Sequence, residues 1–331
     1  MPRVSAEGTV RPPASSHEPV SPAWVLADLD RWVSEPALAD LLAAYDQRLP
    51  AGGLAERLTW LEQFSAQYWD FRSGRERDFI DQVDLPPQVD VAALEAAARL
   101  GLTTSAPPSS QQYSHVVVLG GLARACLLRP AFTAGLVHRG LRAETVTGLA
   151  GFRPLSEMEL SLLDEAGRPP AADEVEVMQQ GLVAAFSLES TVPATDASGG
   201  RGAGDRMHRR WAVEDGPDID LVAAPSSDPA TRRANSADTY AFWASEVAAL
   251  APGDTVLLVT SCIYVPFQGC DAVRVLGLPR GVAVETVGVD VQDEKLGPLR
   301  QTFRAPHFLQ ELRSTVRSVR TLHAEIDPQA G

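Results

Sequence analysis

Lysine is almost absent from this sequence: Lys295 is the only lysine, and the other basic residues are arginines. We interpret this bias as the mark of a GC-rich genome rather than of function. It nevertheless excludes two kinds of chemistry. No lysine follows a glycine-rich loop as the Walker motif requires, and only Lys295 is available to form a Schiff base.

Cysteine and histidine are also too few and too scattered for a metal centre. The three cysteines, an odd number, show no C-x-x-C spacing, which argues against a disulfide framework and a cysteine zinc site. No pair of the six histidines has the spacing of metal ligands, and H-E-x-x-H does not occur. The G-x-S-x-G elbow of α/β-hydrolases is missing as well. We therefore predict no protein-ligated metal.

Positive charge is in short supply, because 29 basic residues face 43 acidic ones and leave a formal net charge of -14. This balance argues against nucleic acid and against an anionic membrane surface as partners, since both need a basic face. No apolar run approaches the ~20 residues of a membrane helix. Residues 1–21 are rich in proline and lack the apolar stretch of a signal peptide, so we predict a disordered lead-in and a cytoplasmic protein.

The first pattern that the sequence does contain is a helical region over residues 22–105. Apolar residues recur there at helical spacing, as in Leu54, Leu58, Leu61, Phe64 and Tyr68. The region is rich in tryptophan and tyrosine, which favours helix–helix packing or contact with another domain. The proline- and serine-rich stretch 103–112 that follows is predicted to be a linker.

Beyond this linker, short apolar strands alternate with helices. The predicted strands are the short stretches His115–Leu119, Ala143–Thr147, Ile219–Ala223, Thr255–Thr260 and Val282–Val287, of which the first is a continuous apolar run. Helices are predicted at about 130–139, 173–186, 230–250, 266–276 and 307–326, and the glycine-rich stretch 195–205 is predicted to be a mobile loop. This alternation is typical of a parallel sheet buried on both faces. We predict an α/β, Rossmann-like domain over residues 106–331, with helices on both faces of its sheet.

Ligands of such sheets bind beyond the carboxyl ends of the strands, where the strand order switches. The first predicted strand ends in Gly120 and Gly121, and Arg124 follows in the next helix. Adjacent glycines let backbone N–H groups approach an anion, and a guanidinium adds charge. An ordinary tight turn with a surface arginine fits the same residues equally well.

The second predicted strand leads into another glycine, Gly148, with Arg153 and Glu157 a few residues further on. One cation and one carboxylate beside a glycine-rich loop suit a polar ligand. A flexible loop without function is the alternative.

Two later strand exits add further polar residues. Asn235 falls inside a predicted helix, where asparagine is a poor residue, so its carboxamide is a candidate ligand contact. The clearest strand ends in Thr260 and Ser261, followed by Cys262 and Tyr264, which together with Glu157 are the candidates for chemistry. Cys262 acts as a nucleophile only if a base or a helix dipole lowers its pKa, and a buried, inert cysteine is the alternative.

The order of these motifs resembles the DUF218 family, the YdcF/SanA/ElyC-like proteins. The family's strand end V-L-G-G, glycine loop with S-E, T-x-x-N helix start and strand V-L-L-V-T-S correspond here to Val118–Gly121, Thr147–Glu157, Thr231–Asn235 and Val256–Ser261. Three departures stand out. The threonine–asparagine spacing is one residue longer, Ile263-Tyr264 replaces Tyr-His, and Gln268 stands where the family has arginine.

The resemblance implies a Rossmann-like fold and a nucleotide-type ligand, S-adenosylmethionine being one candidate. We therefore predict an enzyme, a transferase or a hydrolase, that acts on a nucleotide-like or other anionic small molecule, with a place in biosynthesis. Gln268 joins the predicted ligand contacts by its position in the family pattern. The alternative is a non-catalytic ligand-binding or scaffold protein that has lost the family's His and Arg. A homodimer whose helical extension covers the partner's pocket is a third hypothesis.

Overall fold

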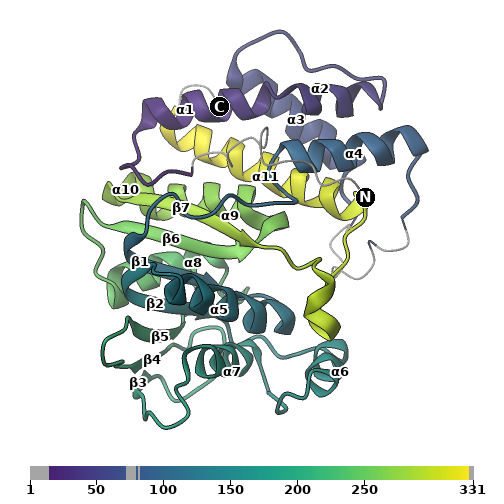
Figure 1. The fold of residues 1–331 in the computed structure, drawn as a ribbon. Helices are drawn as coiled ribbons and strands as arrows, with labels where there is room; N and C mark the ends of the chain where they lie inside the picture. The colour runs from purple at the N-terminus through teal and green to yellow at the C-terminus, as the bar shows by residue number, and fades with distance from the viewer. Residues whose placement is uncertain (1–14, 72–79, 81–82, 328–331) are drawn as a thin grey trace.

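The computed structural model describes residues 15–71, 80 and 83–327, and its centre is a seven-stranded sheet (Figure 1). The strand order is β3-β4-β5-β2-β1-β6-β7. The parallel strands are β1 (Gln112–Leu119), β2 (Arg142–Ala150), β5 (Asp218–Ala223), β6 (Thr255–Ser261) and β7 (Ala283–Val289). Each of them overlaps a predicted strand, so the α/β fold expected from the sequence is confirmed.

Helices bury both faces of this sheet. Val116, Val117 and Val118 of β1 have no exposed surface, which is why the strand is a continuous apolar run. On one face α5 (Ala123–His138) packs against α7 (Glu174–Phe186). On the other face α8 (Ser236–Phe242) packs against α9 (Val265–Ala272).

The direction of travel across the sheet reverses between β1 and β6. From β1 the chain crosses to β2 and then outward to β5, and afterwards it returns to the opposite side of β1, to β6 and β7. Right-handed crossovers in opposite directions place their helices on opposite faces. A crevice therefore opens at the carboxyl ends of β1 and β6, where open α/β sheets bind ligands.

The helices before β1 form a third layer together with the last helix of the chain (Figure 1). They are α1 (Pro22–Val33), α2 (Pro36–Ala43), α3 (Leu54–Tyr68) and α4 (Pro87–Arg99). The last helix, α11 (Ala305–Ile326), packs against α3 and α4 with one side and against α9 with the other. Trp32 and Trp69 are buried in this layer, so its aromatic residues serve packing.

The outer edge of β7 is covered by a segment that was predicted to be disordered. The Ser16 N–H donates to the carbonyl of Val284 at 2.9 Å, and the Thr286 N–H donates to Ser15 Oγ at 3.0 Å. Residues 1–14 of the predicted lead-in lie outside the described residues. For Ser15 and Ser16 the prediction was wrong, because an unpaired strand edge offers partners that composition does not reveal.

The predicted linker contacts the same edge. The Gly288 N–H donates to Ser105 Oγ at 2.9 Å, and the Glu285 carboxylate accepts hydrogen bonds from the N–H and Oγ of Ser109 at 2.8 and 2.6 Å. Tyr113 Oη donates to the same carboxylate at 2.6 Å. Residues 15–16 and 105–109, which we call the edge cover, thus occupy the side of β7 that has no neighbouring strand.

The predicted mobile loop 195–205 contains part of a β-hairpin. β3 (Ala194–Ala197) pairs antiparallel with β4 (Met207–Trp211), and β4 pairs antiparallel with β5. These strands were not predicted because neither forms an apolar run: β3 is exposed throughout, and only Met207 and Trp211 of β4 are buried.

Several helix boundaries also differ from the prediction. α5 begins at Ala123 rather than near Pro130, and the proline lies inside it. The predicted helix 230–250 begins only at Ser236 and continues as a π-helical turn. A further helix that was not predicted is α6 (Glu157–Glu165). Short helical segments within the described residues include η2 (Trp243–Val247), η3 (Cys262–Tyr264), η4 (Val273–Gly277), α10 (Leu278–Arg280) and η5 (Glu294–Leu299).

Candidate functional site

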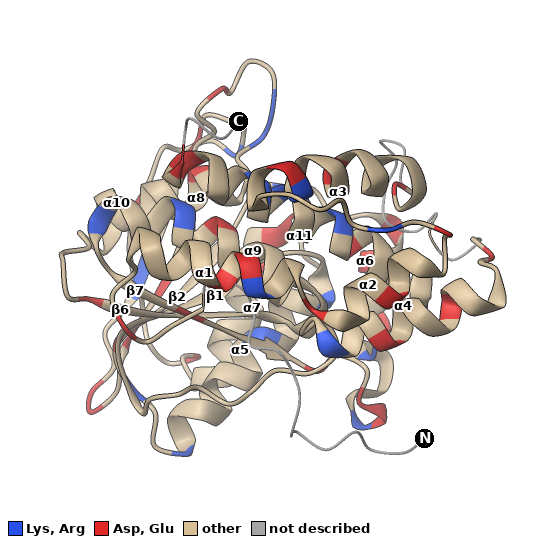
Figure 2. Ribbon diagram, turned by 90° about the horizontal axis from the view of Figure 1, so that it is seen from above, with Lys and Arg blue, Asp and Glu red and all other residues tan. Residues whose placement is uncertain are grey.

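A cavity of about 650 Å³ lies in the crevice at the strand-order switch. Its walls come from the carboxyl ends of β1, β2, β5 and β6 and from the segments that follow them. Among the described residues, five arginines line it, namely Arg124, Arg129, Arg153, Arg232 and Arg233, whereas Glu174 is the one acidic residue in the lining. Figure 2 shows that acidic and basic positions are otherwise interspersed over the helices. The excess of guanidinium groups makes this cavity suited to an anion.

Arg129 joins the two strands at the switch point. It extends from α5, where it is 1% exposed, and donates to the carbonyls of Leu119 and Gly120 at 2.8 and 2.5 Å. Its Nε and Nη2 reach Ser261 Oγ at the end of β6, at 3.3 and 3.2 Å. Arg129 therefore holds the ends of β1 and β6 in fixed positions and brings Ser261 to the cavity.

Arg124 lies one turn earlier on α5 and lines the cavity with a half-buried side chain. Within the described residues its guanidinium forms no hydrogen bond or ion pair, and its Nε is buried without an acceptor. Burial lowers the pKa of this guanidinium, while the nearby Tyr264 acts in the opposite direction. An arginine in this condition has donors available for an anionic ligand.

The glycine turn after β1 does not present free N–H groups to the cavity. The Gly121 N–H donates to Glu174 Oε1 at 3.0 Å, and the Ala123 N–H at the start of α5 donates to Glu159 Oε1 at 2.9 Å. A Cβ at position 120 would overlap Glu174 Oε1 and would lie 2.6 Å from the Leu149 carbonyl oxygen, so the site requires glycine there. The chain's own carboxylates thus occupy the donors that the sequence suggested for a ligand.

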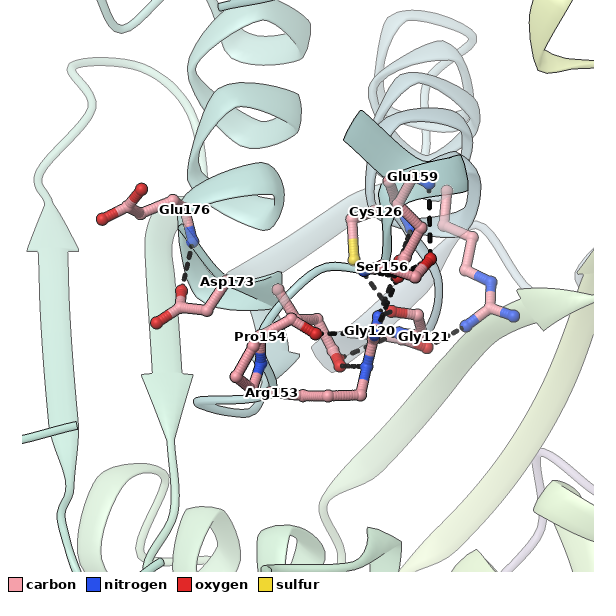
Figure 3. Close-up of polar contacts among 12 residues, drawn as sticks. Gly120, Gly121, Cys126, Arg153, Pro154, Ser156, Glu159, Asp173 and Glu176 are labelled. Atoms are coloured by element: carbon pink, nitrogen blue, oxygen red, sulfur yellow. Dashed lines mark hydrogen bonds and ion pairs between the residues drawn. The ribbon is translucent and has the colours of Figure 1, made fainter. Parts of the chain in front are cut away.

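Arg153 is shared by these two carboxylates. Figure 3 shows Arg153 and Glu159 near the turn formed by Gly120 and Gly121. Arg153 Nη1 and Nη2 donate to Glu159 at 2.8 Å each, and its Nε donates to Glu174 Oε2 at 3.3 Å. Nη2 also donates to the Gly121 carbonyl at 3.0 Å. Glu159 completes the capping box of α6 with Ser156, which fixes its position. We call Arg153, Glu159 and Glu174 the carboxylate pair with its arginine.

The two carboxylates differ in acidity. Burial alone would raise the pKa of Glu159, but the hydrogen bonds from Arg153 and from the N–H groups of Ser156 and Ala123 lower it to about 2. Burial raises the pKa of Glu174 to about 7, against the opposing effect of Arg153. Glu174 therefore changes charge near neutral pH, while Glu159 stays ionised.

At the end of β6, Ser261, Tyr264 and Gln268 line the cavity. The Tyr264 ring lies under the Arg129 guanidinium, 5.8 Å from its carbon to the ring centre. Thr260 is fully buried and donates to Gln268 Oε1, so it orients Gln268 without lining the cavity. Cys262 is absent from the lining, and burial raises the pKa of its thiol to about 12, which leaves no thiolate for catalysis.

The wall formed before α8 contributes Arg232, Arg233 and Asn235. Asn235 is the N-cap of α8 rather than an interior residue: its Oδ1 accepts from the Asp238 N–H at 3.0 Å. Asp238 in turn binds the Arg232 guanidinium, with 3.1 Å between Nη2 and Oδ1. Arg233 has no ion pair within the described residues, so it is the second guanidinium here, after Arg124, that no carboxylate neutralises.

The loop between β3 and β4 closes one side of the cavity with Gly202 and Ala203. Arg201 fixes this loop by ion pairs with Asp173 and Glu176 at the start of α7, at 2.6 and 3.1 Å. Its guanidinium carbon also lies 5.4 Å from the ring centre of Phe152, another cavity residue.

The structure brings together most of the predicted site residues. Those in the cavity lining are Gly120, Gly121, Arg124, Arg153, Asn235, Ser261, Tyr264 and Gln268. Gly148, Glu157, Thr260 and Cys262 are not in it. Gly148 lies inside β2, where a Cβ would come within 3.1 Å of Met178 and Leu182, so it serves packing against α7. Glu157 is exposed on the first turn of α6.

Glu174 and Glu159 are residues of the candidate site that the sequence-based prediction did not include. One signal for Glu174 was available, because the helix predicted from residue 173 must begin at the carboxyl edge of the sheet, where ligands bind. No group of three or more histidine, cysteine, aspartate or glutamate residues is placed to hold a metal ion in the described part of the chain. Among the described residues, the helices are too short or too polar to cross a membrane.

Fold and cavity together define a doubly wound α/β protein with an arginine-lined crevice at its switch point. A family model described as the Rv3785 N-terminal domain matches residues 16–101, which include the helices α1 to α4. The uncharacterized proteins Rv3785 of Mycobacterium tuberculosis and Mb3814 of Mycobacterium bovis are each 32% identical over 328 residues, covering 90% of this chain and 89% of theirs. The chain belongs to the Rv3785 family. No solved structure matches it.

Proposed function

We propose that this protein binds an anionic, nucleotide-like small molecule in the cavity and acts on it as a transferase or a hydrolase. The observation that carries the proposal is the set of five arginines around a cavity with one acidic residue, in a chain of net charge -14. Charge of one sign gathered against the overall balance attracts a ligand of the opposite charge. A distant relationship to the DUF218 family is part of the same proposal.

The unpaired guanidinium groups indicate where the anionic portion binds. Arg124 and Arg233 lack carboxylate partners within the described residues, so each can form charge-assisted hydrogen bonds to phosphate or carboxylate oxygens. Leu122, Leu149 and Phe152 supply apolar surface in the same cavity, suited to a planar ring. The excess positive charge favours a phosphate-bearing ligand over S-adenosylmethionine, whose sulfonium is itself a cation.

Tyr264 is the best-placed residue for chemistry. It lines the cavity at the switch point, with its ring under the Arg129 guanidinium and with Arg124 nearby. We propose that Tyr264 contacts the reacting group of the ligand, with Ser261 and Gln268 orienting it. Cys262 has no part in this proposal, because it is buried outside the cavity lining.

Thermal unfolding with a panel of ligands tests the proposal. The panel contains nucleoside mono- and diphosphates, S-adenosylmethionine, S-adenosylhomocysteine and sugar phosphates. A ligand that binds only the folded protein adds about 2.7 kcal/mol of stability at a hundredfold excess over Kd. We expect a phosphate-bearing compound to raise the melting temperature of the wild type and not that of Arg124→Ala.

The matched control is Arg139→Ala, which removes an exposed arginine from the opposite end of α5. This variant should show the wild-type shift. If every compound leaves the melting temperature unchanged, or if Arg124→Ala shifts as the wild type does, the ligand site is not where we place it. The first result would instead favour a scaffold without a small-molecule ligand.

A further inference from the structure

One arginine serves two carboxylates in the wall of the proposed anion site. Arg153 forms two short hydrogen bonds to Glu159 and a single longer one, 3.3 Å, to Glu174. When both carboxylates are ionised, this group carries one net negative charge. Glu174 lines the cavity, so that charge faces whatever occupies it.

The surroundings of Glu174 offer little further compensation. Groups that face it from the neighbouring elements are Arg129 and Cys126 on α5, Arg153 after β2, and the Gly121 N–H after β1. Arg129 already donates to the carbonyls of Leu119 and Gly120 and to Ser261. On the first turn of α7, Asp173 and Glu176 are paired with Arg201. The side chain of Glu174 is 12% exposed, so solvent screens its charge weakly.

We propose that an anion enters this cavity together with one proton, and that Glu174 takes up that proton from solvent. The inference rests on the proposed function, since it requires an anionic ligand. An anion beside an ionised, poorly screened Glu174 would face a like charge, and protonating the carboxylate removes the repulsion. The neutral carboxyl group gains an O–H donor that can point to an anionic oxygen.

Of the two carboxylates, Glu174 is the one that can accept a proton near neutral pH. Burial already raises its pKa to about 7, so neutralising it near neutral pH requires little. Glu159, by contrast, accepts hydrogen bonds from Arg153, Ser156 and Ala123, and these keep it ionised. In the anion-bound state, Arg153 and Glu159 therefore remain an ion pair while Glu174 is neutral.

Sulfate is the probe of choice because it is a tetrahedral dianion that does not itself titrate near neutral pH. Its Kd would be measured by calorimetry from pH 6 to pH 8.5 at constant ionic strength, for the wild type, Glu174→Gln and the control Glu165→Gln. Glu165 is exposed at the end of α6. Each titration at pH 7.5 would be repeated in a second phosphate-free buffer of different ionisation enthalpy, which counts the protons taken up directly.

For the wild type and Glu165→Gln we expect Kd to be level below the pKa of Glu174, about 7, and to rise above it by up to about tenfold per pH unit. Uptake should be about three quarters of a proton at pH 7.5, because a carboxyl group with a pKa of about 7 is already about one quarter protonated in the free protein at that pH. Glu174→Gln should bind sulfate with a Kd that hardly changes with pH and should take up no proton. The proton count for the wild type does not depend on how well the variant folds.

Two results would overturn the inference, and they are distinguishable. Sulfate binding that Arg124→Ala weakens, but that is independent of pH and releases or takes up no proton in the wild type, rejects the role of Glu174 and leaves the proposed function intact. If sulfate and the phosphate-bearing compounds all fail to bind at every pH, both the inference and the proposed function are wrong.

Discussion

At the scale of single residues, Arg153 has the largest electrostatic burden in the site, because it offsets two poorly exposed carboxylates. In Arg153→Met, Glu159 and Glu174 lose their common cation, and removing one partner of a buried ion pair costs roughly 3–5 kcal/mol. We expect a loss towards the lower end of that range, because the guanidinium is itself 24% exposed. Urea unfolding measures it, with exposed Arg168→Met as the control.

The loss in Arg153→Met should depend on pH with a definite sign. Glu159 has its pKa lowered to about 2 in the fold, so the stability it contributes is complete above its ordinary pKa of 4.5 and disappears as the pH falls towards 2. The difference between wild type and variant should therefore shrink in acid. A difference that is constant from pH 7 to pH 3 would mean that Arg153 stabilises the protein by packing alone.

Residue positions at strand ends could be predicted from the sequence, but side-chain directions within the following helices could not. Gly121 and Tyr264 come directly after apolar runs, so the end of each strand locates them. The prediction named Glu157 as a site residue, whereas Glu159 is the residue that accepts hydrogen bonds from Arg153. Side chains two positions apart on a helix point in directions that differ by about 200°. An error of two positions therefore exchanges a buried residue for an exposed one. The capping-box spacing of Ser156 and Glu159 marks the start of α6 in the sequence, but the prediction did not use it.

At the scale of elements, α5 and α7 cross at a point set by Gly181. Pro130 inside α5 has no N–H for the Cys126 carbonyl, and Gly181 of α7 lies against that carbonyl oxygen. In Gly181→Ala the new Cβ would overlap the oxygen and come within 3.1 Å of Pro130 Cγ. We expect a loss of about 1–3 kcal/mol in the free energy of unfolding, as for other overpacked contacts.

Chemical denaturation of Gly181→Ala and of a control, Gly53→Ala, would measure this loss. A Cβ at Gly53 meets no atom within 4 Å, and φ there is -68°, so the control should unfold like the wild type. Equal stability of the two variants would show that α5 and α7 separate at little cost. Because both helices carry site residues, a loosened crossing should also weaken anion binding.

Among the elements, the parallel strands were predictable and the hairpin was not. β1, β6 and β7 are buried along nearly their whole length. Because both faces of these strands are buried, most of their residues are apolar, and this pattern can be recognised in the sequence. β3 and β4 lie at the margin of the sheet and are held by backbone hydrogen bonds, which any residue type can make. The start of α8 was placed too early, because Asn235 caps the helix from outside.

At the scale of the whole molecule, α11 joins the helical layer to the sheet layers. Leu312 is fully buried in it, and Leu→Ala substitutions at such positions cost about 2–5 kcal/mol. Because α11 packs against α3, α4 and α9, we expect Leu312→Ala to destabilise both layers together. Tryptophan fluorescence and far-ultraviolet circular dichroism should report one shared transition at a lower denaturant concentration.

Arg317→Ala, an exposed substitution on the same helix, is the control and should leave the transition in place. Two separate transitions in Leu312→Ala would show instead that the helical layer and the sheet unfold as independent units. That outcome would also mean that the boundary predicted near residue 105 separates two domains in the thermodynamic sense.

The edge cover and α11 have a consequence for the order in which the protein can be completed during synthesis. Ser15 and Ser16 pair with β7, and α3 and α4 pack against α11, so these segments depend on partners that leave the ribosome much later than they do. The amino-terminal helices must wait, with their apolar faces unmatched, until residues 305–326 emerge. The helical layer can close only after α11 has been made, and in that interval its apolar faces are open to chaperones and to aggregation.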